Sequence, residues 1–145
     1  MSFRIASSSD DSAAIKKYAK VPLYNANEIK NMEALVATSI AEGATVAYGG
    51  KQPQGAEFEK GHWFEPTILT NVTQDMTIVH KESFGPILPV LKFSEFDEVI
   101  RYANDSEFGL AAMVFTNDVN KIMKYIKQTR EVKYVPDIKR SYKKD

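Results

Sequence analysis

The sequence predicts a single α/β domain with a mostly parallel sheet and flanking helices. In the second half, strand-like apolar runs alternate with amphipathic helical segments, the usual order of right-handed parallel crossovers. The 145 residues amount to one domain, and a hydrophobic content of 43% is enough to fill one core. No internal repeat or linker divides the chain, so we expect one domain over residues 12–136.

The two ends of the chain are expected to lie outside this domain. Residues 1–11 form a flexible leader in this interpretation, because their serines and aspartates offer nothing to bury. Ser12 can cap a short helix over residues 13–20, which Pro22 ends. Residues 137–145 form a basic tail, which we interpret as a solvated end rather than a nucleic-acid signal.

The first strongly patterned helix runs from about residue 26 to residue 42. Asn25 can cap its N-terminus, with Glu28 as the capping-box partner. Gly43 stands where a left-handed residue commonly ends a helix. The apolar side chains that define its buried face are Ile29, Met32, Leu35, Val36 and Ile40.

Two strands and one helical turn follow this helix. Residues 45–48 form a short strand that a pair of glycines ends. Residues 63–69 are extended, and because Pro66 cannot donate to a ladder, we expect an edge or bulged strand there. Residues 75–79 suit a single helical turn.

The second half continues with a strand over residues 87–93. This strand is expected to be buried on both faces except near Pro89. Ser94, with Asp97 three positions later, can begin a helix that extends to about Ala103. Its apolar stripe consists of Phe96, Val99, Ile100 and Ala103.

A further strand, a third helix and a last short strand complete the prediction. The strand covers residues 110–116, and Asn117 or Asp118 begins the helix. Residues 133–135 can form the last strand. The apolar side of the helix consists of Val119, Ile122, Met123 and Ile126.

Composition excludes several classes of function. Nineteen basic residues balance nineteen acidic ones, so no global field favours nucleic acid or an anionic membrane. No apolar run reaches transmembrane length, and the N-terminus is no secretory signal, so we expect a soluble cytoplasmic protein. The chain contains no cysteine, and His62 and His80 fit no metal-ligand spacing, so we expect no metal site.

From about residue 26 to residue 129 the chain contains a series of short motifs. These are Glu42-Gly43-Ala44, Gly49-Gly50, Phe64-Glu65-Pro66-Thr67, Asn71-Val72, Asp75-Met76, Glu82-Ser83-Phe84-Gly85-Pro86, Ala103-Asn104-Asp105, Phe108-Gly109-Leu110-Ala111-Ala112 and Val114-Phe115-Thr116. In their order and spacing they resemble a middle-to-late slice of the aldehyde dehydrogenase catalytic domain. The resemblance implies a partial aldehyde-dehydrogenase-like α/β fold.

The resemblance implies two cofactor-binding residues and a nicotinamide cofactor, NAD or NADP. A glutamate at the position of Glu82 bonds the hydroxyls of the nicotinamide ribose, and a carboxylate can accept from both. Phe84 stands at the aromatic position that lies against the nicotinamide, and an aromatic face can support a planar ring. Without the neighbouring motifs, Glu82 would be interpreted as a solvated loop residue and Phe84 as a core residue.

The catalytic residues of the family have no counterpart in this sequence, so we assign none. The family's nucleophilic cysteine, general-base glutamate and nucleotide-binding domain lie further upstream than the 81 residues before Glu82. A substitute pair of Ser83 and His80 can be named, because covalent catalysis needs a nucleophile beside a base. Proximity in sequence alone does not establish that geometry, and no third, orienting group is apparent.

Three functions remain open at this point. The first is an aldehyde-dehydrogenase-like domain that does not oxidise aldehydes alone. The second is an interaction module that forms a homo-oligomer or docks on a full-length aldehyde dehydrogenase through exposed strand edges and apolar faces. The third is one subunit of a split dehydrogenase whose companion supplies the cysteine and the nucleotide domain.

Overall fold

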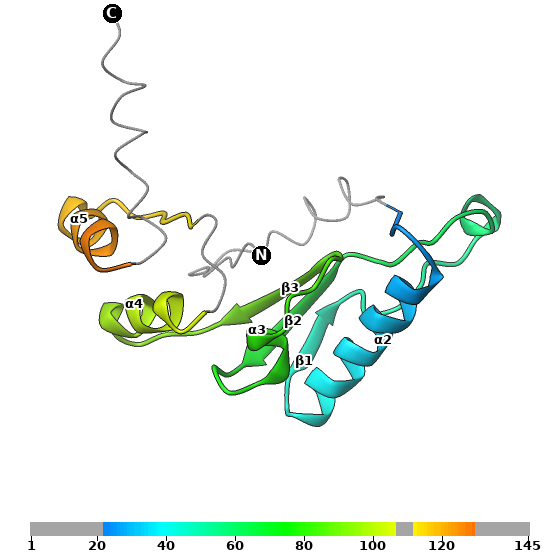
Figure 1. Cartoon of the computed structure of the whole chain (residues 1–145), viewed down its shortest axis with the longest axis horizontal. Helices are drawn as coiled ribbons and strands as arrows, with labels where there is room; N and C mark the ends of the chain where they lie inside the picture. The colour runs from blue at the N-terminus through cyan, green and yellow to red at the C-terminus, as the bar shows by residue number, and fades with distance from the viewer. Residues whose placement is uncertain (1–21, 107–111, 130–145) are drawn as a thin grey trace, which may run out of the picture. The chain divides into compact units, whose positions relative to one another are not determined.

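The computed structural model describes residues 22–106 and 112–129 (Figure 1). The predicted leader, the helix over 13–20, the strand over 133–135 and the basic tail lie outside the described residues. The chain divides into two compact units, with the boundary between Lys92 and Phe93. The bounds of the predicted domain, residues 12–136, stay a prediction.

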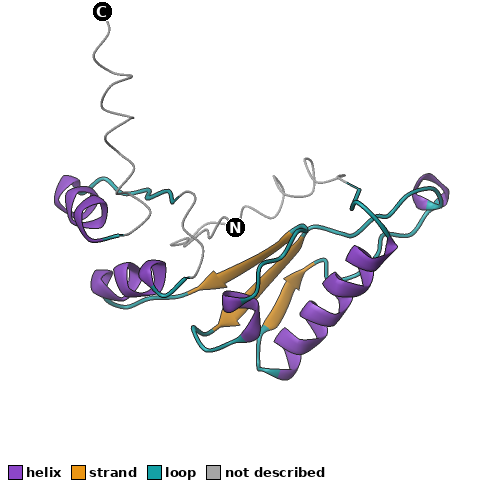
Figure 2. Cartoon of the chain, viewed as in Figure 1, coloured by secondary structure: helices purple, strands orange, loops and turns teal. Residues whose placement is uncertain are grey.

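The unit before the boundary contains a three-stranded sheet in the order β1, β2, β3 (Figure 2). Its strands are β1 (Thr45–Tyr48), β2 (Thr67–Val72) and β3 (Ile87–Leu91). β1 is antiparallel to β2, whereas β2 is parallel to β3. The α/β fold class is therefore confirmed, but the sheet is mixed rather than mostly parallel. Between β1 and β2 the described chain has no α-helix, only the short 3-10 helix η1 (Ala56–Phe58), whereas α3 (Thr77–His80) lies between β2 and β3 in the sequence.

The central strand differs from its prediction in place and in role. It begins at Thr67, one residue after Pro66, so the proline removes no donor from the ladder. The prediction of an edge strand is wrong, because β2 pairs on both sides. The register does shift between Leu69 and Val72, where Asn71 adopts a φ of 55°.

Helix α2 (Ala26–Ala41) confirms the longest predicted helix, with Asn25 and Gly43 at its two ends. The predicted capping-box role of Glu28 is not found, because its carboxylate accepts from the Asn31 side chain instead. The Asn25 side chain accepts a hydrogen bond of 3.0 Å from the amide of Glu28. Gly43 has a φ of 107°, as the predicted left-handed end requires. The buried face is displaced from the predicted one, since Ile40 is 51% exposed; it consists of Met32, Leu35, Val36 and Ser39.

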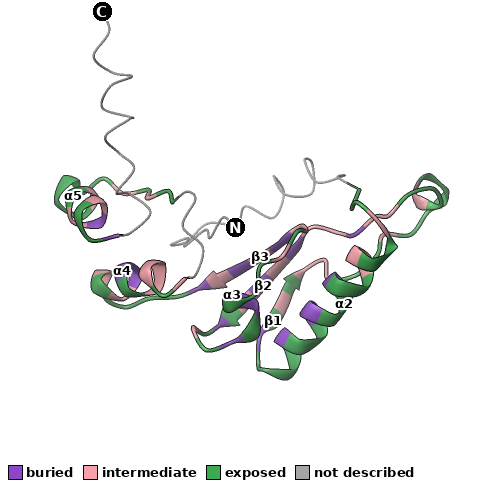
Figure 3. Ribbon diagram, viewed as in Figure 1, coloured by how far each residue is buried: buried purple, intermediate pink, exposed green. Residues whose placement is uncertain are grey.

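The core of this unit joins α2, α3 and one face of the sheet (Figure 3). Leu69 of β2 and Ile78 of α3 are fully buried. Along β3 the pattern alternates, so Pro89 is buried while Leu88 and Val90 are half-buried. The prediction that β3 is buried on both faces is therefore wrong for the described residues, because both helices contribute to the same core cluster.

The unit after the boundary contains α4 (Phe96–Asn104) and α5 (Val119–Gln128). Asp118 caps α5 as predicted, accepting from the amides of Asn120 and Lys121. Helix α4 begins at Phe96 and is capped by Glu95, with Glu98 as the capping-box partner, rather than by Ser94 with Asp97. The two helices are joined by a hydrogen bond of 2.8 Å from the Asn104 side chain to the Gln128 carbonyl and by a Lys124–Asp97 ion pair.

The predicted strand over residues 110–116 is not found in its described part. Residues 112–116 form no strand, and residues 110 and 111 lie outside the described residues. Met113 is 68% and Phe115 78% exposed, since no strand pairs with this segment within residues 22–106 and 112–129. The predicted apolar side of α5 is also exposed at Val119 and Met123, whereas Tyr125 is buried.

Candidate functional site

Both predicted cofactor residues lie in the loop over residues 81–86, which connects α3 to β3. The loop begins where the Lys81 amide donates to the Thr77 carbonyl at 3.0 Å. Glu42, just after α2, fixes the start of α3, since its carboxylate accepts from the amide and the hydroxyl of Thr77. The helix that precedes the 81–86 loop, α3, is thereby bonded to the residue that follows α2.

Glu82 and Phe84 are both exposed to solvent. The Phe84 side chain is 74% exposed, so the interpretation of Phe84 as a core residue is wrong. Glu82 is exposed as well, so its carboxylate is open to a ligand. The structure thus presents an acceptor and an aromatic ring two positions apart on one loop.

The end of the 81–86 loop is held firmly, in contrast to these exposed side chains. Gly85 packs against α2, because an added Cβ would lie only 2.2 Å from the Met32 sulfur. The Pro86 carbonyl accepts from the Thr67 amide at 2.7 Å, and the Ile87 amide donates to the Gly85 carbonyl at 2.9 Å. Glu82 and Phe84 therefore project from a segment that α2 and β2 hold in place.

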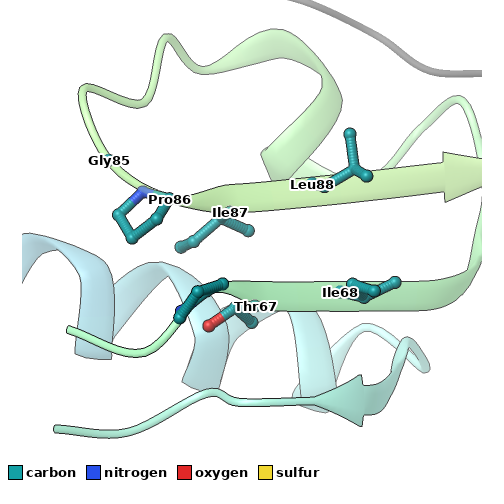
Figure 4. A pocket seen from close by; sticks show the side chains of 7 residues that line it. Thr67, Ile68, Gly85, Pro86, Ile87 and Leu88 are labelled. Carbon is teal, nitrogen blue, oxygen red and sulfur yellow. The ribbon is translucent and has the colours of Figure 1, made fainter. Parts of the chain in front are cut away.

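A pocket of about 260 Å³ opens beside this fixed segment (Figure 4). Figure 4 shows Pro86 and Ile87, where β3 begins, opposite Thr67, where β2 begins. The lining is almost entirely apolar and therefore suits an apolar or aromatic group better than a charged one. It consists of Pro66, Thr67, Ile68, Gly85, Pro86, Ile87 and Leu88.

The structure does not bring Ser83 and His80 together as nucleophile and base. The Nε2 atom of His80 lies 2.7 Å from the Gln74 carbonyl. A carbonyl oxygen only accepts, so Nε2 donates this bond and is not free to accept a hydrogen bond from Ser83. Within the described parts of the chain, no hydrogen bond joins Ser83 to His80.

One carboxyl close to the loop has a shifted pKa. The Thr73 hydroxyl donates to Asp75 at 2.5 Å and, together with a backbone amide and the nearby His80, holds the pKa of Asp75 below its usual value. Among residues 22–106 and 112–129, no group of three or more His, Cys, Asp or Glu side chains could hold a metal ion. No helix of that same part is long and apolar enough to span a membrane.

The sequence patterns contain the residues that support the site but do not connect them with it. Met32, Glu42 and Thr67 contact the loop or the segments next to it, although they lie far from it in the sequence. Local patterns place Met32 on a buried face of α2 but do not name its partner. The motif Phe64-Glu65-Pro66-Thr67 contains Thr67 but does not indicate that the Thr67 amide donates to the Pro86 carbonyl.

Comparison with known proteins identifies a family. The sequence profile of the aldehyde dehydrogenase family matches residues 10–134. The chain is 59% identical over 105 residues to 3,6-anhydro-alpha-L-galactose dehydrogenase of Vibrio sp. (strain EJY3), covering 72% of this chain and 21% of the relative. It is 44% identical over 106 residues to lactaldehyde dehydrogenase of Escherichia coli (strain K12), covering 73% of this chain and 21% of the relative.

Solved structures give the same result. A structure of 3,6-anhydro-L-galactose dehydrogenase in complex with NAP matches with a TM-score of 0.71 and 64% identity, over 74% of this chain and 22% of that chain. A structure of betaine aldehyde dehydrogenase from Staphylococcus aureus in complex with NAD+ matches with a TM-score of 0.72 and 38% identity, over 75% of this chain and 22% of that chain. The chain spans about a fifth of the length of these relatives.

Proposed function

Because the chain belongs to the aldehyde dehydrogenase family, we propose that its 81–86 loop forms one side of a nicotinamide-cofactor site. Glu82 accepts hydrogen bonds from the ribose hydroxyls, and Phe84 lies against the nicotinamide ring. When bound, NAD or NADP supplies a hydride acceptor for aldehyde oxidation. The residues of this chain bind and orient that cofactor.

The exposure of Phe84 is the observation that carries this proposal. A phenylalanine that is 74% exposed adds little to folding, because most of its apolar surface stays in water. The ring nevertheless stands next to a tightly packed glycine, so its position is fixed at the backbone. A ring held in place but left uncovered is suited to stacking with a planar ligand.

We also propose that the 145-residue chain does not oxidise aldehydes alone. The family resemblance implies a covalent step on a cysteine thiolate, and these 145 residues contain no cysteine. The 81–86 loop supplies only part of a cofactor site, and few contacts must then offset the cost of association. Weak cofactor binding without turnover is the expected behaviour.

Calorimetric titration of NAD into the purified chain tests the proposal, with a parallel titration of NADP. We expect saturable binding that the Glu82→Gln substitution weakens, because the amide keeps the shape but loses an acceptor and the charge. The same variant should unfold at the same urea concentration as the parent chain, since Glu82 is exposed. Absence of binding to either cofactor, or equal affinity of the two proteins, would contradict the proposal.

A second function, association with another polypeptide, is favoured by exposed apolar side chains in the unit after Phe93. Met113, Phe115 and Val119 are each at least 68% exposed. Such surfaces are commonly covered by a partner. Sedimentation of the pure chain should then show a homo-oligomer, or sedimentation of its mixture with a full-length aldehyde dehydrogenase should show a complex. A monodisperse monomer that binds no such enzyme would exclude both.

A split enzyme is the specific form of association that the 81–86 loop supports. A companion polypeptide that carries the family's cysteine and nucleotide domain would complete the site. Mixing the two should give NAD-dependent aldehyde oxidation that depends on Glu82. Activity that is unaffected by Glu82→Gln would mean that this chain contributes no cofactor contact.

A further inference from the structure

Thr67 connects two turns that are far apart in the sequence. It is the first residue of the central strand β2 and is 1% exposed. One turn is Gly49-Gly50, which follows β1, and the other is Gly85-Pro86, which ends the 81–86 loop. Thr67 contacts both turns through hydrogen bonds, one from its side chain and one from its backbone.

The side chain of Thr67 serves the Gly49-Gly50 turn. Its Oγ1 accepts from the Gly50 amide at 2.8 Å and donates to the Glu65 carbonyl at 2.8 Å. Both glycines have positive φ, and a Cβ at Gly49 would lie 2.0 Å from the Pro66 carbonyl oxygen. The turn therefore lies directly against Pro66, and the Thr67 hydroxyl holds it there by accepting from the Gly50 amide.

The backbone of Thr67 serves the 81–86 loop. Its amide donates to the Pro86 carbonyl at 2.7 Å, and Figure 4 shows Pro86 and Ile87 opposite it. A displacement of Thr67 would move the Pro86 carbonyl with it. Phe84 is only two residues before that carbonyl, so its backbone would move as well.

We infer that Thr67 is a positioning residue for the 81–86 loop, whose hydroxyl links the Gly49-Gly50 turn to the placement of Glu82 and Phe84. The inference concerns the arrangement of the loop, and its importance for cofactor binding rests on the proposed function. A buried hydroxyl with both of its hydrogen bonds satisfied is well suited to hold one geometry. Loss of that hydroxyl would leave the half-buried Gly50 amide without its acceptor.

Two variants of Thr67 test the link. Thr67→Ser keeps the donor and the acceptor, whereas Thr67→Val keeps the shape and removes both. Amide hydrogen exchange of Thr67 and Ile87 reports the loop directly, because these amides bond Pro86 and Gly85. We expect Thr67→Val to speed their exchange by about tenfold relative to the Ala44 amide, and Thr67→Ser to leave the ratio unchanged.

Cofactor affinity gives a second, separate readout. Ser39→Ala is the matched control, because Ser39 is also fully buried and its hydroxyl donates to the Leu35 carbonyl within α2. Thr67→Val should weaken NAD binding by about tenfold, while Thr67→Ser and Ser39→Ala bind as the parent chain does. If Thr67→Val and Ser39→Ala weaken NAD binding equally at matched stability, Thr67 is a purely structural residue.

The two readouts separate failure of the inference from failure of the proposed function. If the parent chain binds no NAD, the proposed function is wrong, and hydrogen exchange alone decides whether Thr67 positions the loop. If NAD binds but Thr67→Val changes neither affinity nor the exchange of Thr67 and Ile87, the inference is overturned and the proposed site remains.

Discussion

Gly85 lies directly on the side chain of Met32, so closely that the space for a Cβ is already occupied by the Met32 sulfur, 2.2 Å from that position. Met32 is 2% exposed and belongs to the core cluster. The φ of Gly85 is not in the left-handed range, so space rather than backbone conformation requires glycine here. This contact joins α2 to the loop that carries the candidate cofactor residues.

Gly85→Ala should therefore destabilise the chain by overpacking, by about 1–3 kcal/mol. Met32→Ala removes the obstructing side chain and should cost about 2–5 kcal/mol through the cavity that it leaves. The double variant should cost less than the sum of the two single effects, because the new Cβ enters the vacated space. Urea unfolding measures all three, and additive costs would show that the two residues do not interact.

Phe84→Ala should change the free energy of unfolding by no more than about 0.5 kcal/mol, because the ring is 74% exposed. Phe64, which is 3% exposed and belongs to the core cluster, is the matched control. Phe64→Ala should cost about 3–5 kcal/mol in the same urea titration. A cost near 3 kcal/mol for Phe84→Ala would mean that the ring is buried, and it would remove the basis of the proposed function.

Asn25→Ala should destabilise α2 by about 1 kcal/mol, because the Glu28 amide loses its side-chain acceptor. Asn31 provides a comparison on the same helix, where it is exposed and its side chain donates to the Glu28 carboxylate at 3.3 Å. Asn31→Ala should be neutral or slightly stabilising, since alanine has the higher helix propensity. Equal losses for the two variants, measured by thermal or urea unfolding, would contradict the capping role.

Glu98 makes the stability of α4 depend on pH. Its carboxylate accepts from the amides of Ser94 at 2.9 Å and Glu95 at 3.3 Å, and these bonds hold the pKa of Glu98 below its usual value of 4.5. A lowered pKa in the folded state gives stability that is present above pH 4.5 and is lost as the pH falls through the folded value.

The difference in free energy of unfolding between the parent chain and Glu98→Gln should therefore be constant near neutral pH and become smaller below pH 4.5. Urea midpoints of the two proteins measured across this range give the difference, and an NMR titration of the carboxyl gives the pKa itself. A pKa of 4.5 or higher would show that the two amide bonds do not favour the charged form.

The helix ends could be predicted from the sequence because their causes are local. Asn25 and Gly43 act within a few residues of α2, and both behave as predicted. The strand over residues 63–69 was displaced because Pro66 was placed inside it, whereas the first paired residue is Thr67. Its central position could not be predicted, since pairing partners are not encoded in local patterns.

The candidate site was reached through family resemblance rather than through residue pattern. Pattern alone would have placed Phe84 in the core, and the structure leaves it exposed. Met32 and Thr67 hold the loop through contacts between segments that are distant in the sequence. Such contacts cannot be predicted from the residues around 81–86. The cofactor roles of Glu82 and Phe84 stay predictions until binding is measured.

The mixed sheet also bears on how the chain folds. Each strand pairs with its neighbour in the sequence, and the paired residues are 25 positions apart in Thr45 with Thr70 and 20 apart in Thr67 with Ile87. Pairings over such separations must offset the entropy of closing the loops between them. All pairings of the described sheet lie within residues 45–91, N-terminal to α4 and α5, so they become available first during synthesis. We therefore expect the sheet to form on the nascent chain, ahead of the unit that begins at Phe93.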